Sequence, residues 1–509
     1  MASSKNLKLG GILSYIGIAV TIITGFIYTP LMINNIGKSN YALFTLAMSF
    51  ISFFILDFGI SAAVTRYVSI YKASNEEHKI NDFLGITVKL FLIIDFIIMI
   101  ILFIGYFFLE DIFLQLTTIE LLKFKKVYII IAVYSIISFP FMPINAILTS
   151  YEEFTYMKTV DLLQKIFSFM ILLIAIWLKS NLYTIVFINT FTNFFNIFLK
   201  YRFIKKKLHI KSNIFYQDRL ILKDIISFST WSTIILISQR FILNIGPTLL
   251  GRLSGTDQIA FFSIGSSIEG YFWLFANALN SLFLPSVSRI MYNKNNSQVE
   301  NRKDLEVLSV KVGRIQLMIS GILYVIFLII GKDFLFLWLS GDYSQSYYVI
   351  VLLILPGIIT YTQTIAYNFL TIANEIKYRA FSFIGSAVIS VVLSVILIPK
   401  MGAIGMALGA CLGIICGQIL LLNYFLQKKF TFNLMYFFKN VHLKLLPFFS
   451  LVSLILFSMN KLFFTSNIKV LLLKIIIFSL IYIILLFLVG LNHYEKKVVN
   501  GVLKKIIRR

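Results

Sequence analysis

The chain has 509 residues, of which 59% are hydrophobic and only 13% charged, and its mean hydropathy is +0.88. These values exclude an ordinary soluble domain and indicate a polytopic membrane protein. In a soluble protein the net charge of +24 would suggest a nucleic-acid partner, but in a membrane protein Lys and Arg collect in cytoplasmic loops. No nucleic-acid partner is therefore expected.

Long apolar runs follow one another along the chain and predict membrane-spanning helices, because a β-barrel would show short alternating segments. The first two runs, 11–33 and 41–63, form a hairpin around a short polar corner. Fourteen spans are expected, at about 11–33, 41–63, 83–108, 127–149, 160–178, 182–199, 225–249, 259–284, 312–331, 347–370, 380–398, 403–425, 445–464 and 468–490. The predicted fold class is an all-α polytopic membrane protein.

The distribution of basic residues predicts the orientation. With the N-terminus inside, cytoplasmic segments and helix ends hold 32 Lys and Arg, the outside loops hold 10, and four lie within spans. This bias is a strong positive-inside signal and places both termini in the cytoplasm. The first run is too long for a signal-peptide core and lacks a small-residue cleavage site, so it is expected to be the first span.

The chain shows no signature of a metal or haem site. Both cysteines, Cys411 and Cys416, lie in an apolar run, and the four histidines fall in loops or tails without ligand spacing. Neither a metal site nor a cofactor is expected.

The longest cytoplasmic connection, 200–224, mixes the basic run Lys205-Lys206-Lys207 with apolar residues such as Phe203 and Phe215. This pattern is typical of a segment that lies on the inner leaflet and is held there by anionic lipid.

The two halves of the chain repeat each other at an offset of 217 to 222 residues. The offset matches Pro30 with Pro247, Gly37 with Gly255, Asp111 with Asp333, and Lys179 with Lys400. Six spans per repeat make the two halves parallel, a plan in which substrate binds between the halves. We divide the chain into an N-terminal six-helix lobe (1–199), a cytoplasmic basic linker (200–224), a C-terminal six-helix lobe (225–428), and helices 13 and 14 with a cytoplasmic tail (429–509).

A plan of six, six and two spans with this hairpin resembles the polysaccharide-unit flippases (O-antigen type, Wzx-like) of the multidrug/oligosaccharidyl-lipid/polysaccharide exporter superfamily. The residues that carry the resemblance are Pro30, Gly37, Tyr41, Asp57-Phe58-Gly59, Arg66, Glu269, Leu284-Pro285-Ser286-Val287-Ser288 and Lys400-Met401-Gly402-Ala403-Ile404-Gly405.

The resemblance implies alternating-access transport of an undecaprenyl-pyrophosphate-linked oligosaccharide across the bacterial cytoplasmic membrane, for O-antigen of lipopolysaccharide, capsule or a related glycan. Membrane lipids and the polymerase and chain-length proteins of the same pathway are the further partners it implies. Lipid II flippases carry basic residues where this chain has Tyr28 and Ser266, which favours the polysaccharide branch.

Arg240 in span 7 and Glu269 in span 8 are the clearest ionisable groups at membrane depth, where such groups are costly unless paired or wetted. Arginine suits a pyrophosphate because its planar fork donates two hydrogen bonds and stays charged. Arg240 is therefore the candidate pyrophosphate ligand, with Glu269 as its partner or as a coupling-ion site. The alternative is a structural Arg–Glu pair that only fixes two helices.

Further candidates for the substrate cavity are Tyr28, Asp57, Lys89, Asp95, Lys311 and Arg314. Snorkelling to the headgroups would also explain the three basic ones. Asp161 and Lys165 have i,i+4 spacing, which favours local pairing. Pro30 and Pro247 are the candidate hinges.

Two other functions stay open at this point. A cation-coupled multidrug extruder of the same superfamily is one, although twelve spans would suit it better than fourteen. A membrane polysaccharide polymerase or glycosyltransferase is less favoured, because the outside loops are short, and no enzyme is expected. The coupling ion, a proton or sodium, is not fixed by the sequence.

Overall fold

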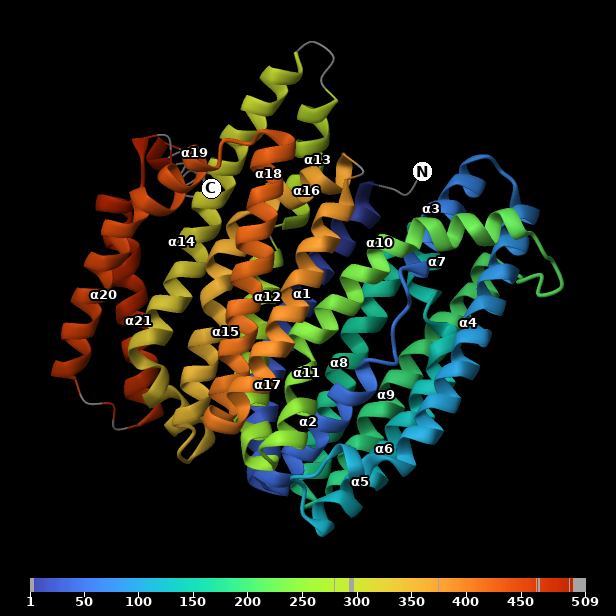
Figure 1. Ribbon diagram of the computed structural model, residues 1–509, viewed down its shortest axis with the longest axis horizontal. Helices are drawn as coiled ribbons and strands as arrows, with labels where there is room; N and C mark the ends of the chain where they lie inside the picture. Colours follow the sequence, from blue (N-terminus) through green and yellow to red (C-terminus); the bar gives the residue numbers. More distant parts are fainter. Residues whose placement is uncertain are drawn as a thin grey trace. The chain divides into compact units, whose positions relative to one another are not determined.

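The computed structural model describes residues 4–278, 280–292, 297–373, 375–463, 465, 467–493 and 495–497. Within these residues every regular element is a helix and none is a strand, which confirms the all-α fold class (Figure 1). The C-terminal end of the expected cytoplasmic tail, beyond residue 497, lies outside the described residues.

Eleven helices of the described residues are long and apolar enough to cross a membrane, or twelve if the pair 219–227 and 229–243, bent by 43°, counts as one span. The expected number of fourteen is thus not confirmed. One reason is that the second expected span, 41–63, is not one helix. Another is that the two expected spans 380–398 and 403–425 lie in one continuous helical segment, 376–430, with a non-helical residue at Gly402.

The contacts divide the chain into two compact units. The first comprises Met1–Ser267 and Ile376–Gln418, and the second comprises Ile268–Glu375 and Ile419–Arg509. Two of the boundaries fall inside helical elements, α12 (Thr256–Ala278) and η3 (Ile415–Leu421). The division into two sequence-contiguous lobes and a linker stays a prediction.

The first unit contains the helices of the N-terminal half together with the pair of helices that follows residue 376. Its elements are α1 (Ser4–Ile36), α2 (Lys38–Ser52), α3 (Ile60–Ala73), α4 (Glu77–Phe107), α5 (Leu109–Ile112), α6 (Thr118–Ser138), η1 (Phe139–Phe141), α7 (Ile144–Ser150), α8 (Phe154–Trp177), α9 (Leu182–Phe203), η2 (Ile204–Leu208), α10 (Arg219–Leu243), α11 (Ile245–Leu253) and α17 (Ile376–Ile414).

A ladder of small residues joins the two arms of the α17 segment. Gly402 has φ 55° and reverses the chain, which a residue with a side chain rarely allows. Beyond it, a Cβ added at Gly409 would overlap Ser394, and a Cβ at Gly413 would overlap Ser390. Small residues at this four-residue spacing let two membrane helices approach closely, as the glycine cluster in this region suggests.

The second unit is built on one long helix, α14 (Gln298–Leu339), against which α20 (Lys444–Leu462) and α21 (Ile468–Leu485) pack (Figure 1). Their apolar side chains form one buried cluster that includes Leu317, Phe448 and Tyr482. The other elements of this unit are α13 (Asn280–Met291), α15 (Ser344–Thr362), α16 (Thr364–Ile372), α18 (Leu422–Phe430), α19 (Leu434–Phe438), η4 (Lys439–Leu443) and η5 (Leu486–Gly490).

The corners of the two hairpin copies have the same local geometry. Gly37, before α2, has φ 84°, and Gly255, before α12, has φ 90°. Only glycine adopts such angles without strain. The two glycines that the repeat matches therefore allow the same turn of the backbone before a helix.

Candidate functional site

The second apolar run is interrupted near its middle. Helix α2 ends at Ser52 and α3 begins at Ile60, and between them Phe58 and Gly59 have φ of 49° and 67°. The Asp57 carboxylate accepts a hydrogen bond from the Gly59 N–H at 3.2 Å. Non-helical backbone at membrane depth is tolerated only where it is buried in protein or lines a water-filled cavity. The residues of this break are therefore expected to be buried or to face a cavity.

Side chains of helix α10 donate hydrogen bonds to two backbone carbonyls of the break. The Thr233 hydroxyl donates to the Phe58 carbonyl at 2.6 Å, and the Ser229 hydroxyl donates to the Gly59 carbonyl at 3.2 Å. A Cβ at Gly59 would stand 3.0 Å from the Ser229 carbonyl oxygen, so glycine permits this close approach. The break is thereby fixed against the helix that carries Arg240.

Asp57 and Arg240 line the same cavity, which has a volume of about 680 Å³ and lies within the first unit. Its walls come from the break, from α3, from the α6–α7 region, and from α8, α9 and α10. The polar side chains of the lining are Asp57, Ser61, Thr65, Tyr134, Ser138, Asn145, Thr149, Lys158, Asp161, Asn196, Lys200 and Arg240.

The cavity has a surplus of positive charge, because it is lined by the three cations Lys158, Lys200 and Arg240 and by the two carboxylates Asp57 and Asp161. In a region of low dielectric constant a surplus charge of this kind acts strongly on a ligand. The cavity therefore favours an anion.

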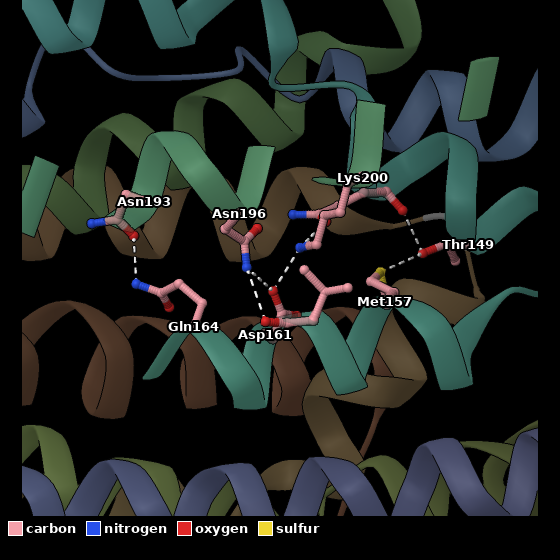
Figure 2. A network of polar contacts seen from close by, with 9 residues as sticks. Thr149, Met157, Asp161, Gln164, Asn193, Asn196 and Lys200 are labelled. Carbon is pink, nitrogen blue, oxygen red and sulfur yellow. Dashed lines mark hydrogen bonds and ion pairs between the residues drawn. The ribbon is translucent and has the colours of Figure 1, made fainter. Parts of the chain in front are cut away.

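One of the three cations is neutralised inside the protein (Figure 2). The Lys200 ammonium donates to Asp161 at 2.6 Å and to the Asn145 side-chain carbonyl at 2.9 Å, and the Asn196 amide donates to the same Asp161 oxygen at 3.2 Å. Only 4% of the Lys200 side chain is exposed, against 34% of that of Asp161. This network joins α8 to α9 and fixes that wall of the cavity.

The other two cations form no ion pair with a described residue of the first unit, and the Asp57 carboxylate interacts electrostatically with the Arg240 guanidinium from a longer distance. Among the described residues of the first unit, no carboxylate lies within ion-pair distance of either the Arg240 guanidinium or the Lys158 ammonium. An ionisable group at membrane depth is costly unless it is paired or wetted, so a cavity lined by two cations outside any ion pair is a suitable place for a multiply charged anion.

Glu269, on α12, belongs to the second unit and accepts a hydrogen bond from the Tyr361 hydroxyl at 3.3 Å. Arg240 belongs to the first unit. The expected pairing of Arg240 with Glu269 stays a prediction.

Arg314 makes bonds that hold the protein's own chain together. Its guanidinium donates to both Glu495 carboxylate oxygens, at 2.6 and 3.0 Å, and to the carbonyls of Asn440 and Gly490. The guanidinium thus ties α14 to the segments at both ends of the C-terminal helix pair. Its expected role as a cavity residue stays a prediction.

Four further residues were expected in the substrate cavity but do not line the cavity that contains Asp57 and Arg240, namely Tyr28, Lys89, Asp95 and Lys311. The Lys89 ammonium donates to the Tyr216 carbonyl at 2.6 Å and so fixes the connection between α9 and α10. Asp95 is buried on α4, and one of its oxygens has no hydrogen-bond partner among the described residues. Lys311 is an exposed residue of α14. The Tyr28 hydroxyl is buried on α1, also without a hydrogen-bond partner among the described residues.

The two candidate hinge prolines differ in their surroundings. Pro30 lies inside α1, which continues to Ile36. Pro247 follows a break at Asn244 between α10 and α11, as expected of a residue that cannot donate to the carbonyl four positions earlier. The Ser49 hydroxyl of α2 bonds the free Asn244 carbonyl. The hinge role of both prolines stays a prediction.

The expected local pairing of Asp161 with Lys165 is wrong. The Asp161 carboxylate pairs with Lys200 of α9, while the Lys165 ammonium donates to the Thr21 hydroxyl and the Gly17 carbonyl of α1, at 2.6 and 3.3 Å. Contacts between helices override the i,i+4 pairing here, because both side chains find hydrogen-bond partners on a neighbouring helix.

Most polar residues of the cavity were not among the candidates selected from the sequence, and Asn145, Lys158, Asn196 and Lys200 are the ones that form the charged wall. Both lysines were counted with cytoplasmic loops, but α8 begins at Phe154 and α9 continues to Phe203, so both lie on helices. The i,i+4 spacing of Asn196 and Lys200, which puts them on one helix face, is a signal that could have found them.

No cluster of three or more His, Cys, Asp or Glu residues that could hold a metal ion occurs in the described part of the chain. Cys411 and Cys416 are free thiols.

Comparison with known families gives a match over residues 8–291 to the family described as polysaccharide biosynthesis protein. No curated protein sequence matches the chain.

Several solved structures share the fold. The lipid II flippase MurJ in an inward closed conformation is 17% identical, with a TM-score of 0.71 over 94% of this chain and 97% of that chain. An inward-facing multidrug resistance MATE family transporter of the MOP superfamily is 14% identical, with a TM-score of 0.64 over 81% and 97%. A MOP superfamily transporter from Pyrococcus furiosus, described as having a binding pocket of reverse polarity, is 13% identical, with a TM-score of 0.58 over 82% and 93%.

Variants of the Asp161–Lys200 pair test whether Lys200 stabilises the fold, in contrast to Lys158. Asp161→Asn leaves the Lys200 ammonium buried without its counterion, so we expect the free energy of unfolding to fall by about 2 kcal/mol, less than for a fully buried pair because Asp161 is partly exposed. Adding Lys200→Met should recover most of this loss. Thermal unfolding of the purified protein in detergent measures both effects.

Lys158→Gln is the matched control, because it removes an unpaired cation from the same cavity and should leave the unfolding temperature nearly unchanged. Equal losses for Asp161→Asn and Lys158→Gln would contradict the assignment of Lys200 to the structure and of Lys158 to the ligand.

Proposed function

Since the chain belongs to the polysaccharide biosynthesis protein family, we propose that it flips undecaprenyl-pyrophosphate-linked oligosaccharide repeat units across the bacterial cytoplasmic membrane. The product would serve surface polysaccharide synthesis, such as that of O-antigen or capsule. The single observation that carries this proposal is the cavity in which cations outnumber carboxylates and in which Arg240 and Lys158 form no ion pair.

The pyrophosphate is the part of such a substrate that the two cations would bind. Arg240 would donate two parallel hydrogen bonds to phosphate oxygens, and Lys158 would act as a mobile point charge. Charge-assisted hydrogen bonds of this kind contribute about 1.5–3 kcal/mol each. Asp57, which interacts electrostatically with Arg240, would limit the affinity, because a transporter must also release its substrate.

The remaining lining suits the sugar part of the substrate. Hydroxyl and amide groups on three walls offer donors and acceptors to sugar hydroxyls, from Ser61, Thr65, Tyr134, Asn145, Thr149 and Asn196. The volume of about 680 Å³ lies in the range of ligand pockets, roughly 300–1,000 Å³, and accommodates a few sugar rings at a time. The lipid tail would stay in the bilayer.

A set of polar bonds between the two hairpin corners supports alternating access. We call this set the corner contact: Lys38 pairs with Asp257 at 2.9 Å, and the hydroxyls of Ser39 and Thr256 both donate to Glu120, at 2.6 and 2.7 Å. The charge distribution predicts that these corners are extracytoplasmic. We therefore interpret this conformation as closed to the outside, with transport requiring the corner contact to open.

A cation-coupled multidrug extruder is the second candidate, because a MATE transporter shares the fold. The surplus of cations in the cavity is unfavourable for a cationic drug, so the flippase is the better supported function. In either case a proton or a sodium ion would serve as the coupling ion, with Glu269 as the candidate carboxylate.

Charge reversal at Arg240 tests the proposed function. In a strain that lacks its own copy of the gene, Arg240→Glu should abolish surface polysaccharide, and Arg240→Gln should lower the export rate about 10- to 100-fold through the loss of charge-assisted bonds. Arg240→Lys should retain part of the activity, because it keeps the charge and loses the fork. Surface polysaccharide is measured against the amount of the protein in the membrane.

Arg202→Glu is the control for a general effect of charge, since Arg202 is exposed in the last turn of α9 and does not line the cavity. Normal surface polysaccharide from Arg240→Glu at a normal protein level would refute the proposed role.

Locking the corner contact tests alternating access. In a background with Cys411→Ala and Cys416→Ala, a short bis-methanethiosulfonate reagent should bridge the thiols of the pair Ser39→Cys and Thr256→Cys, because both native hydroxyls contact the same Glu120 oxygen. Cross-linking should then stop export, and a reductant should restore it. The single variant Ser39→Cys controls for the reagent, and export by the cross-linked protein would exclude opening at these corners.

A further inference from the structure

A second cavity of the first unit, with a volume of about 590 Å³, differs in character from the proposed substrate cavity. It lies between the start of α4, the η1–α7 turn and the end of α9, and residues 209–214 form one of its walls. Its lining consists of Leu84, Val88, Pro140, Phe141, Pro143, Ile144, Ile147, Tyr201, Ile204, Lys205, His209, Ile210, Lys211, Ser212 and Ile214.

The lining of this cavity has an apolar part and a basic part. The walls from α4, η1 and α7 are apolar, and they would hold a hydrocarbon chain rather than a sugar. The basic groups, Lys205, His209 and Lys211, all come from η2 and the connection that follows it. An apolar chamber with cations on one wall is complementary to an amphiphile that has an anionic head and an apolar tail.

The connection that forms this wall is fixed to α4. The backbone N–H groups of Lys211 and Asn213 donate to Asn81, both at 2.9 Å, and the Asn213 amide donates to Asp82 at 2.6 Å. Asp82 is thus engaged by the connection itself. A Cβ at Gly85 would overlap the Asn213 carbonyl, so the close approach depends on glycine there. The cavity is therefore bounded by an ordered wall.

Exposed apolar side chains next to the cavity indicate contact with lipid. Ile214 is 46% exposed and Phe215 is 93% exposed, immediately after the basic wall residues. An apolar tip beside a basic cluster is typical of a segment that lies at a membrane surface with its cations among anionic headgroups.

We propose that this cavity binds an anionic glycerophospholipid from the leaflet on its side of the membrane. One acyl chain would fill the space between Val88 and Ile147, and the headgroup phosphate would lie between Lys205 and Lys211. The bound lipid would stabilise the connection between α9 and α10, which joins the two halves of the repeat. This lipid site presupposes that the chain lies in a membrane, and it is independent of which substrate the protein transports.

The test measures lipid binding to the purified, delipidated full-length protein. Phosphatidylglycerol, phosphatidylcholine with the same acyl chains, and glycerol 3-phosphate are titrated separately, and bound molecules are counted by native mass spectrometry. We expect tight binding of phosphatidylglycerol only. The double variant Lys205→Gln/Lys211→Gln should weaken it about 30-fold, at roughly 1 kcal/mol for each basic residue.

The matched control is Lys206→Gln/Lys223→Gln, which removes two exposed lysines that do not line the cavity and should change the affinity less than threefold. Val88→Phe, which fills the chamber without changing charge, should also weaken binding. Equal binding of phosphatidylcholine, equal binding of glycerol 3-phosphate, or equal losses in the two lysine variants would each overturn the proposal.

Discussion

The cost of holding charge inside a membrane is the constraint on which the arrangement of the first unit depends. Each ionisable group there must be paired or wetted. Lys200 meets this requirement by pairing with Asp161, and Lys165 by bonding α1, and both are thereby used to hold helices together. Arg240 and Lys158 meet it by lining a cavity. The same rule thus separates the structural cations from those available to a ligand.

The cavity exists because a helix is broken at membrane depth. Helix α2 ends at Ser52, and the hydroxyls of Ser229 and Thr233 on α10 donate hydrogen bonds to the Gly59 and Phe58 carbonyls of the break. The cavity and the break are therefore built from the same part of the chain, because the α10 hydroxyls that bond the break also hold Asp57 beside the helix of Arg240. A similar break between α10 and α11 is bonded by Ser49 of α2.

The all-helical membrane fold could be predicted from the sequence, because long apolar runs are local signals. Arg240 and Asp57 were selected as isolated charges within such runs, and both line one cavity, while their role in transport stays a prediction. The partner of Asp161 could not, since pairing between α8 and α9 depends on how helices pack. Lys158 and Lys200 were missed because helices extend beyond their apolar runs. The expected number of fourteen spans was not confirmed, also because of breaks. The break at residues 53–59 interrupts one apolar run, and the two runs on either side of Gly402 form one continuous helical segment.

The most direct test of the central claim is transport by the purified protein in proteoliposomes. A fluorescent undecaprenyl-pyrophosphate-linked oligosaccharide is placed in one leaflet, and its accessibility to a membrane-impermeant quencher or enzyme is followed in time, with a cationic dye as the competing substrate. The account predicts protein-dependent movement of the lipid-linked oligosaccharide and none of the dye. Movement of the dye without movement of the lipid-linked oligosaccharide would contradict it.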